Sequence, residues 1–129
     1  MLNITSNVTF LYFQDLAEAK RFVSEALEFP VAYDPGWACV YRMGEKSFLG
    51  LVDDRHGSVA GKNHDGVLIS LTVEDIEEAH KAMEAFGVNE LSAIKKVKDI
   101  PLNSFFFTGP EGYRFEVQQF TSGELKEIF

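Results

Sequence analysis

Apolar side chains dominate residues 8–13, and directly after them apolar and polar residues alternate at helical spacing. The first pattern predicts a strand and the second an amphipathic helix. Asp15, with Glu18 three residues later, is typical of a helix N-terminus, and Phe29 and Pro30 predict the end of the helix. The apolar positions of this helix are Leu16, Ala19, Phe22, Val23, Ala26 and Leu27.

The same order of patterns returns after 60 residues. A strand is predicted over residues 67–73, and Asp75 with Glu78 repeats the signal for a helix start. Leu11 and Leu71 match at the same offset. The apolar positions of the second helix are Ile76, Ala79, Ala82, Met83 and Phe86, and Gly87 follows the last of them. The chain therefore contains an internal repeat.

Each predicted helix is followed by three stretches that indicate strands. They are residues 31–34, 37–43 and 46–53 in the first half, and 93–97, 103–108 and 113–120 in the second. Each half is thus a βαβββ module, the first over about residues 6–53 and the second over about 66–120, with a connection over about 54–65. Residues 121–129 predict a short helical turn. The expected fold class is α+β.

A helix covers only one face of its sheet, and the alternation of side chains tells the two faces apart. The residues expected on the uncovered faces are Val8, Phe10 and Tyr12 in the first strand, Leu68, Ser70 and Thr72 in the fifth, and Arg114, Glu116 and Gln118 in the last. In the last strand, three long polar side chains therefore point into one concavity.

Composition limits the classes of function. The 129 residues, 46% of them apolar, suffice for one packed core, so a single domain over residues 1–129 is expected. The formal net charge of −8 repels phosphate backbones and anionic membranes, so neither nucleic acid nor a membrane is an expected partner. The single cysteine, Cys39, indicates a reducing compartment. Because the sequence shows neither a signal peptide nor a transmembrane run, a cytoplasmic location is expected.

Two copies of strand-helix-strand-strand-strand, with Asp-Leu or Asp-Ile at the start of each helix, resemble the vicinal oxygen chelate superfamily of glyoxalases, bleomycin resistance proteins and extradiol dioxygenases. Residues 109–116 are similar to the closing signature of that family, in which a Pro/Gly turn leads into a strand with a glutamate. The resemblance covers essentially the whole chain. It implies that the two modules form a partly closed mixed β-barrel, often completed by a second chain, with small molecules bound inside.

Metal-dependent members of this family take one ligand from the first strand of each half, usually His, and one from the last strand, usually Glu. In this chain the four positions fall on Val8, Gly50, Leu68 and Glu116. Only Glu116 has a ligating side chain, and one carboxylate cannot hold a divalent ion that needs several donors. A shift of the alignment by one residue supplies no histidine either. We therefore expect neither a metal nor another cofactor.

The predicted ligand-binding residues are the polar and aromatic side chains expected to line the cavity: Tyr12, Trp37, Tyr41, Ser70, Arg114, Glu116 and Gln118. Arg114 and Glu116 suit a polar or zwitterionic ligand, and the alternative is a solvated ion pair. Without a metal, Glu116 is also the only candidate general base. The tyrosines and Trp37, together with Phe10, suit a flat ligand, and the alternative is core packing.

The remaining residues of chemical interest fall outside this predicted cavity. His56 and His64 belong to the connecting segment, at a spacing that matches no zinc signature, and His80 is expected at the surface or boundary of the second helix. Cys39 lies within a predicted strand and is expected to be a small buried apolar residue rather than a nucleophile.

Three functions are open at this stage. The first is a metal-free protein similar to bleomycin resistance proteins, which sequester a ligand between two chains. The alternative is a metal-dependent lyase or dioxygenase of the same superfamily, and the third is a regulatory role in which the barrel is only a scaffold. The negative charge suits a cationic ligand. Open sheet edges predict a homodimer.

Overall fold

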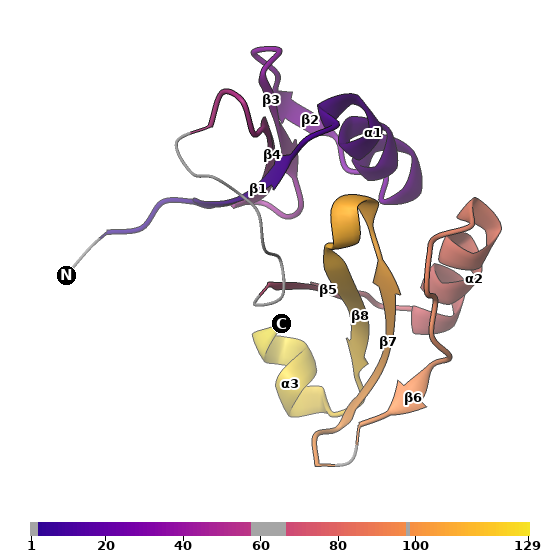
Figure 1. The fold of residues 1–129 in the computed structure, drawn as a ribbon. Coiled ribbons are helices and arrows are strands. Elements are labelled where there is room, and N and C mark those ends of the chain that lie inside the picture. The colour runs from indigo at the N-terminus through magenta and orange to yellow at the C-terminus, as the bar shows by residue number, and fades with distance from the viewer. Residues whose placement is uncertain (1–2, 58–66, 98) are drawn as a thin grey trace. The chain divides into compact units, whose positions relative to one another are not determined.

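A computed structural model describes residues 3–57, 67–97 and 99–129 of the protein (Figure 1). The chain forms two compact units, Met1–Asn63 and His64–Phe129, and each is described by itself. The strand order is β1-β4-β3-β2 in the first unit and β5-β8-β7-β6 in the second. Because both orders follow one scheme, the structure confirms the internal repeat.

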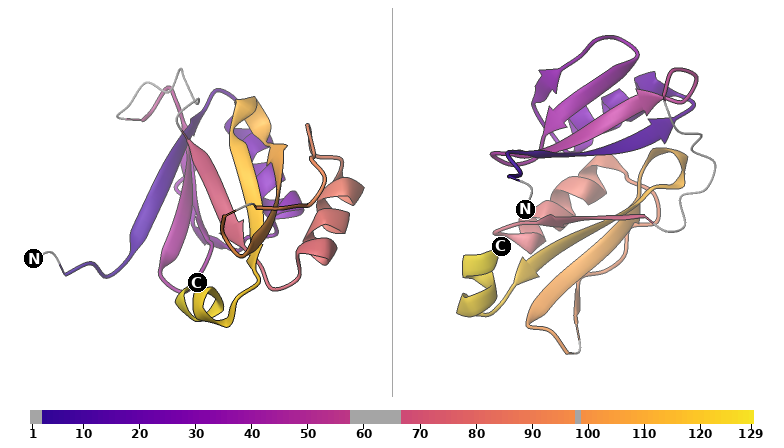
Figure 2. Two further views of the ribbon diagram at one scale, coloured as in Figure 1. Left: turned by 90° about the horizontal axis from the view of Figure 1, so that it is seen from below. Right: turned by 90° about the vertical axis from the view of Figure 1, so that its left-hand side faces the viewer.

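The first unit is a four-stranded mixed sheet with one helical segment. Its elements are β1 (Asn7–Phe13), α1 (Leu16–Arg21), the π-helical turn η1 (Phe22–Ala26), β2 (Val31–Tyr33), β3 (Ala38–Arg42) and β4 (Ser47–Asp53). β1 pairs parallel to β4, whereas β3 is antiparallel to both of its neighbours. Figure 2 shows α1 and η1 against one face of this sheet.

The first helix begins as predicted but ends differently. The Asp15 carboxylate accepts a hydrogen bond from the Glu18 amide at 3.1 Å, which satisfies a donor that has no partner within the helix. From Phe22 the helix widens into a π turn, in which the Leu27 amide donates to the Phe22 carbonyl. Phe22, Val23 and Ala26 are all buried in this wider turn. An α-helical pattern alone did not predict it.

The second unit repeats this plan and adds a helix at its end. Its elements are β5 (Leu68–Thr72), α2 (Ile76–Phe86), β6 (Lys95–Lys96), β7 (Leu102–Thr108), the 3₁₀ turn η2 (Pro110–Gly112), β8 (Arg114–Phe120) and α3 (Gly123–Ile128). Asp75 caps α2 through the Glu78 amide at 3.1 Å, and Gly87 ends it in the left-handed conformation. Figure 1 shows α2 beside the sheet and α3 at the end of β8.

Each unit has its own apolar core between its sheet and its helix. In the first unit, Leu11, Phe13, Cys39, Leu49 and Leu51 are buried from the strands, and Leu16, Ala19, Phe22 and Val23 from the helical segment. In the second unit, Phe107 and Phe115 stack with centroids 5.2 Å apart, and the His80 ring meets Phe105 edge-on at 4.9 Å. The predicted face assignments of β1, β5 and β8 are therefore confirmed.

The α+β class and the two βαβββ modules are confirmed, and both sheets are open. The largest difference concerns the strand predicted over residues 93–97. It shortens to Lys95–Lys96, because it pairs with β7 only at Asn103 and Ser104.

Residues 58–65 of the predicted connection, including His64, lie outside the described residues. That the two modules make one domain stays a prediction. Among the described residues, every helix is too short or too polar to cross a membrane.

Candidate functional site

The sheet of the second unit presents nine side chains on the face away from α2, which we call the polar face. The strand register places them in three rows, Leu68–Arg114–Thr108, Ser70–Glu116–Phe106 and Thr72–Gln118–Ser104. Arg114, Glu116 and Gln118 form the middle column because every second residue of β8 points to the same side. Phe115 and Val117, which alternate with them, are buried toward the helix.

Each of the three long side chains of β8 is held by a residue of a neighbouring strand. Ser70 donates a hydrogen bond to Oε1 of Glu116 at 2.7 Å, and the amide of Gln118 donates to Thr72 at 2.9 Å. Arg114 donates to the Thr108 hydroxyl at 2.6 Å. These cross-strand hydrogen bonds restrict the side chains before any ligand arrives, so that their ordering costs less on binding.

Arg114 and Glu116 do not pair with each other. Within the described ranges, no ion pair joins them, and the Arg114 guanidinium instead lies 5.9 Å from the centre of the Phe106 ring. Residues two apart on a strand are separated by about 6.6 Å along the chain, and each finds a nearer partner on the adjacent strand. Alternation along β8 predicted the positions of these charges, but it did not predict Thr108 and Phe106, which contact Arg114.

The uncovered face of the first unit differs in chemistry, and we call it the aromatic face. Its members by register are Val8, Phe10 and Tyr12 of β1, Phe48, Gly50 and Val52 of β4, and Ala38, Val40 and Arg42 of β3. The Phe10 ring, 49% exposed, lies over Gly50, and the Tyr12 ring lies over Gly57. The Arg42 guanidinium lies 4.9 Å from the centre of the Phe48 ring. A Cβ atom at either glycine would overlap the ring above it.

The structure separates the two remaining aromatic candidates. Trp37, directly before β3, is 49% exposed, as its place next to a turn predicts. Tyr41 is only 1% exposed and lies on the helix-covered face, where its hydroxyl is 2.9 Å from the Ser24 hydroxyl and donates to the Lys20 carbonyl. Our prediction that Tyr41 lines the cavity is therefore wrong, because the uncovered positions of β3 are Ala38, Val40 and Arg42.

Other titratable groups have structural partners in the first unit. Burial raises the pKa of Tyr41 to about 12 and also raises the pKa of the buried Cys39 thiol, which agrees with an inert packing role for Cys39. The Arg55 guanidinium donates two hydrogen bonds to Asp53 and, with the Arg55 backbone amide, holds the pKa of that carboxyl well below its usual range.

The histidines supply no candidate centre in the described part of the chain. The backbone amide of His56 donates to the Asp53 carbonyl, and His80 lies 2.8 Å from the Ser92 carbonyl through Nε2. Among the described residues, no group of three or more His, Cys, Asp or Glu side chains lies close enough to hold a metal ion. His80 is partly buried at the edge of the second core, as expected for a boundary residue.

The four positions at which the resemblance predicts metal ligands have one ligating side chain among them, Glu116. Val8 and Leu68 are exposed aliphatic residues, and Gly50 has no side chain and is covered by Phe10. Glu116 alone offers a carboxylate, and one of its oxygens already accepts from Ser70. A divalent ion needs several oxygen, nitrogen or sulfur donors, which these residues do not provide.

A family model matches residues 5–117, and its description is the Glyoxalase/Bleomycin resistance protein/Dioxygenase superfamily. The chain belongs to this superfamily. A comparison with curated protein sequences found no match.

Solved structures share the fold at low identity. A lactoylglutathione lyase from Agrobacterium tumefaciens is 19% identical, with a TM-score of 0.72 over 96% of this chain and 98% of that one. A superfamily member from Sphaerobacter thermophilus is 19% identical, with a TM-score of 0.73 over 90% and 97%. The fosfomycin resistance protein FosX from Mesorhizobium loti is 14% identical, with a TM-score of 0.66 over the full length of both chains. At these identities the likeness concerns the fold alone.

Proposed function

We propose that this protein binds a small polar molecule on the polar face of its second unit, without the metal ion that related proteins use. The observation that carries the proposal is the column Arg114, Glu116 and Gln118, in which each side chain is fixed by a hydrogen bond with a side chain of an adjacent strand. Such a row of oriented donors and acceptors is what gives a small-molecule site its specificity.

The hydrogen bonds already made on this face define the chemistry that it offers. Glu116 uses Oε1 for Ser70 and keeps Oε2 as an acceptor, and Gln118 uses its amide nitrogen for Thr72 and keeps its carbonyl. Arg114 uses one N–H for Thr108 and keeps others. A ligand with a cationic donor group next to an acceptor matches these free acceptors and donors. The net charge of −8 favours the approach of a cationic ligand to the protein.

The absence of donors at three of the four metal positions supports binding rather than metal-assisted catalysis. A protein that sequesters a compound without converting it, as predicted from the resemblance to bleomycin resistance proteins, requires only such a binding face. In the first unit, Tyr12 and Trp37 stay predicted ligand-binding residues in their own right, since both rings are at least partly accessible and suit a flat apolar group. We leave Tyr41 out because it is buried beneath the helix.

The test is a calorimetric titration of the protein with metal-free bleomycin and with benzamidine, two cationic probes. Glu116→Gln keeps the shape and the acceptor for Ser70 but removes the charge, so we expect affinity for the bound probe to fall by about tenfold or more, the value of a charged hydrogen bond. The control is Glu84→Gln on the exposed surface of α2, which should leave affinity unchanged.

Elemental analysis of the purified protein tests the metal-free part of the proposal separately. We expect less than stoichiometric zinc, nickel, manganese or iron. A tightly held ion at one equivalent would contradict the metal-free proposal. In the calorimetric titration, the contradicting outcome is a Glu116→Gln variant that binds every probe as tightly as the unchanged protein, because Glu116 would then not belong to the site.

A further inference from the structure

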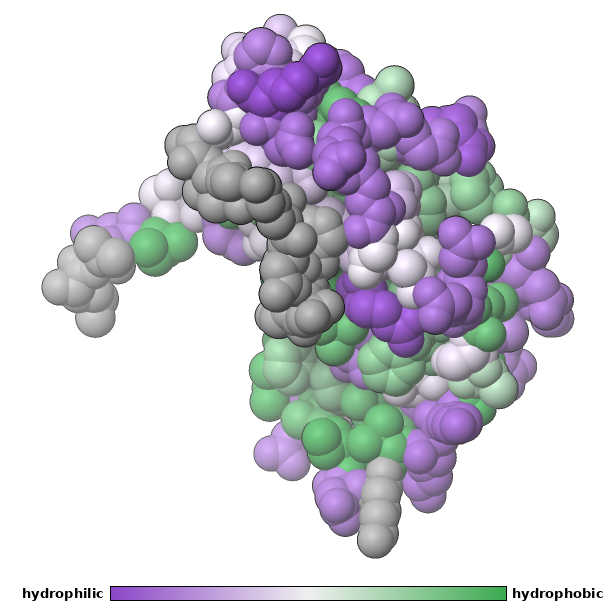
Figure 3. All heavy atoms as spheres, in the orientation of Figure 1, coloured by the Kyte–Doolittle hydropathy of each residue, from purple (hydrophilic) through white to green (hydrophobic). Residues whose placement is uncertain are grey.

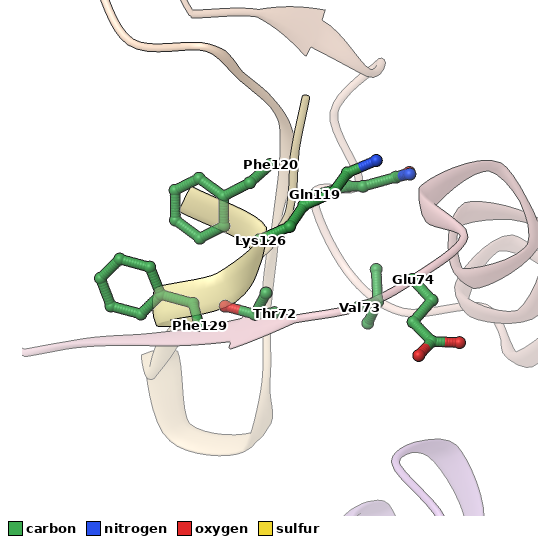
Figure 4. A pocket seen from close by; sticks show the side chains of 7 residues that line it. All are labelled: Thr72, Val73, Glu74, Gln119, Phe120, Lys126 and Phe129. Carbon is green, nitrogen blue, oxygen red and sulfur yellow. The ribbon is translucent and has the colours of Figure 1, made fainter. Parts of the chain in front are cut away.

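The second unit contains a recess at the end of the polar face, beside α3. Its volume is about 510 Å³, and its lining residues are Thr72, Val73, Glu74, Gln119, Phe120, Lys126 and Phe129. Figure 4 shows these side chains, which come from the end of β5, the end of β8 and α3. The recess adjoins the polar face at Thr72, but neither Arg114 nor Glu116 lines it.

One end of the recess is apolar and aromatic. The rings of Phe120 and Phe129 stack with centroids 4.8 Å apart and planes 16° apart. Phe120 is buried, whereas Phe129 is 68% exposed and keeps a ring face available. In the space-filling view, apolar residues gather over α3 (Figure 3). Stacked rings with an accessible face favour a flat apolar ligand group.

The other end carries one cation, one anion and one neutral amide. In the described part of the chain, the side chains of Lys126 and Glu74 take part in neither an ion pair nor a hydrogen bond. Gln119 uses its carbonyl to accept from the Ile76 amide, so its NH₂ group is left to donate. Figure 4 shows the Glu74 carboxylate at the opposite end of the recess from the two rings.

We propose that this recess binds a small molecule with an aromatic body and a head that carries both charges, which is the chemistry of an aromatic amino acid. The ring lies against Phe129, the carboxylate meets Lys126 and the amide of Gln119, and the ammonium group meets Glu74. A ligand with only one charge leaves Glu74 or Lys126 facing it without a counter-charge, so it binds less well.

The first experiment follows amide chemical shifts of the whole protein during titration with L-phenylalanine, 3-phenylpropionate and phenethylamine. We expect saturable shifts at Val73, Gln119 and Lys126 with L-phenylalanine, and weaker binding of the two probes that each lack one charge. Equal binding of all three probes, or an L-phenylalanine titration without saturable shifts at these residues, overturns the proposal.

The second experiment uses substitutions of exposed side chains that leave the fold intact. Lys126→Met and Glu74→Gln should each weaken L-phenylalanine binding by about tenfold, whereas Lys81→Met on the exposed side of α2 should not change it. Because recess binding is read from the amide shifts of Val73, Gln119 and Lys126, any binding at the polar face does not count toward it, so the two sites can fail independently. Full affinity of both recess variants contradicts the proposal.

Discussion

Phe10 and Gly50 together decide what the first unit presents on its uncovered face. They are register partners on adjacent strands, and the ring occupies the space that a side chain at position 50 would need. In the second unit, Glu116 corresponds to Gly50, and its register partner Ser70 corresponds to Phe10. One copy of the repeat therefore offers a ring where the other offers a carboxylate.

This packing predicts a coupled effect on stability. Gly50→Ala should lower the free energy of unfolding by about 1–3 kcal/mol, because the new methyl group meets the Phe10 ring. In a Phe10→Ala background the same substitution should cost clearly less, since the space over Gly50 is then empty. Urea unfolding of the four proteins gives the coupling.

The control for that cycle is Gly44→Ala, since a Cβ there makes only an ordinary contact with Ser47 at 3.9 Å. It should change stability little. Equal costs of Gly50→Ala with and without Phe10 would show that the ring does not limit position 50.

For single residues, alternation along the sequence predicted the sheet faces on which the β8 side chains lie, but not the face of every aromatic side chain. Alternation placed Arg114, Glu116 and Gln118 correctly, because buried residues separate them. It misplaced Tyr41, whose strand has apolar residues on both faces, so that the pattern does not distinguish them. The recess beside α3 could not be predicted from the sequence, because its shape depends on how α3 and Phe129 pack against Phe120.

The elements themselves follow local signals closely. Asp15 and Asp75 both cap their helices through the amide three residues later, and Gly87 supplies the left-handed residue that ends α2. These signals are local in the sequence, so they could be predicted. The π turn η1 and the shortening of β6 could not, because they depend on tertiary packing and strand pairing.

A cap substitution tests the contribution of one element. Asp75→Ala should lower the free energy of unfolding by about 1 kcal/mol, since the Glu78 amide loses its acceptor, and Asp75→Asn should lower it less. Urea unfolding measures both, and Glu84→Ala on the exposed side of α2 is the control. A cost for Asp75→Ala no larger than that of the control would contradict the capping role.

At the scale of the whole molecule, the exposed edge strands bear on assembly. β1 and β2 are the edges of the first sheet, and β5 and β6 are the edges of the second. The edge residues Val8, Val31, Tyr33 and Leu68 are large, apolar or aromatic, and exposed. Unpaired strands with such side chains favour pairing with another chain.

We therefore predict a homodimer. Sedimentation velocity at micromolar protein concentration should give twice the mass of the chain, and Tyr33→Lys, which adds a charge to the exposed edge strand β2, is a first probe of which edge takes part. A monomer under these conditions would contradict the prediction.

The contrast between the aromatic face and the polar face has a consequence for how such a protein diversifies. A duplicated module gives the chain a spare surface, so substitutions at Val8, Phe10 or Tyr12 can sample new specificities while the hydrogen-bonded charges of β8 persist unchanged. Because each unit has its own apolar core, substitutions on the surface of one unit leave the core of the other unit intact.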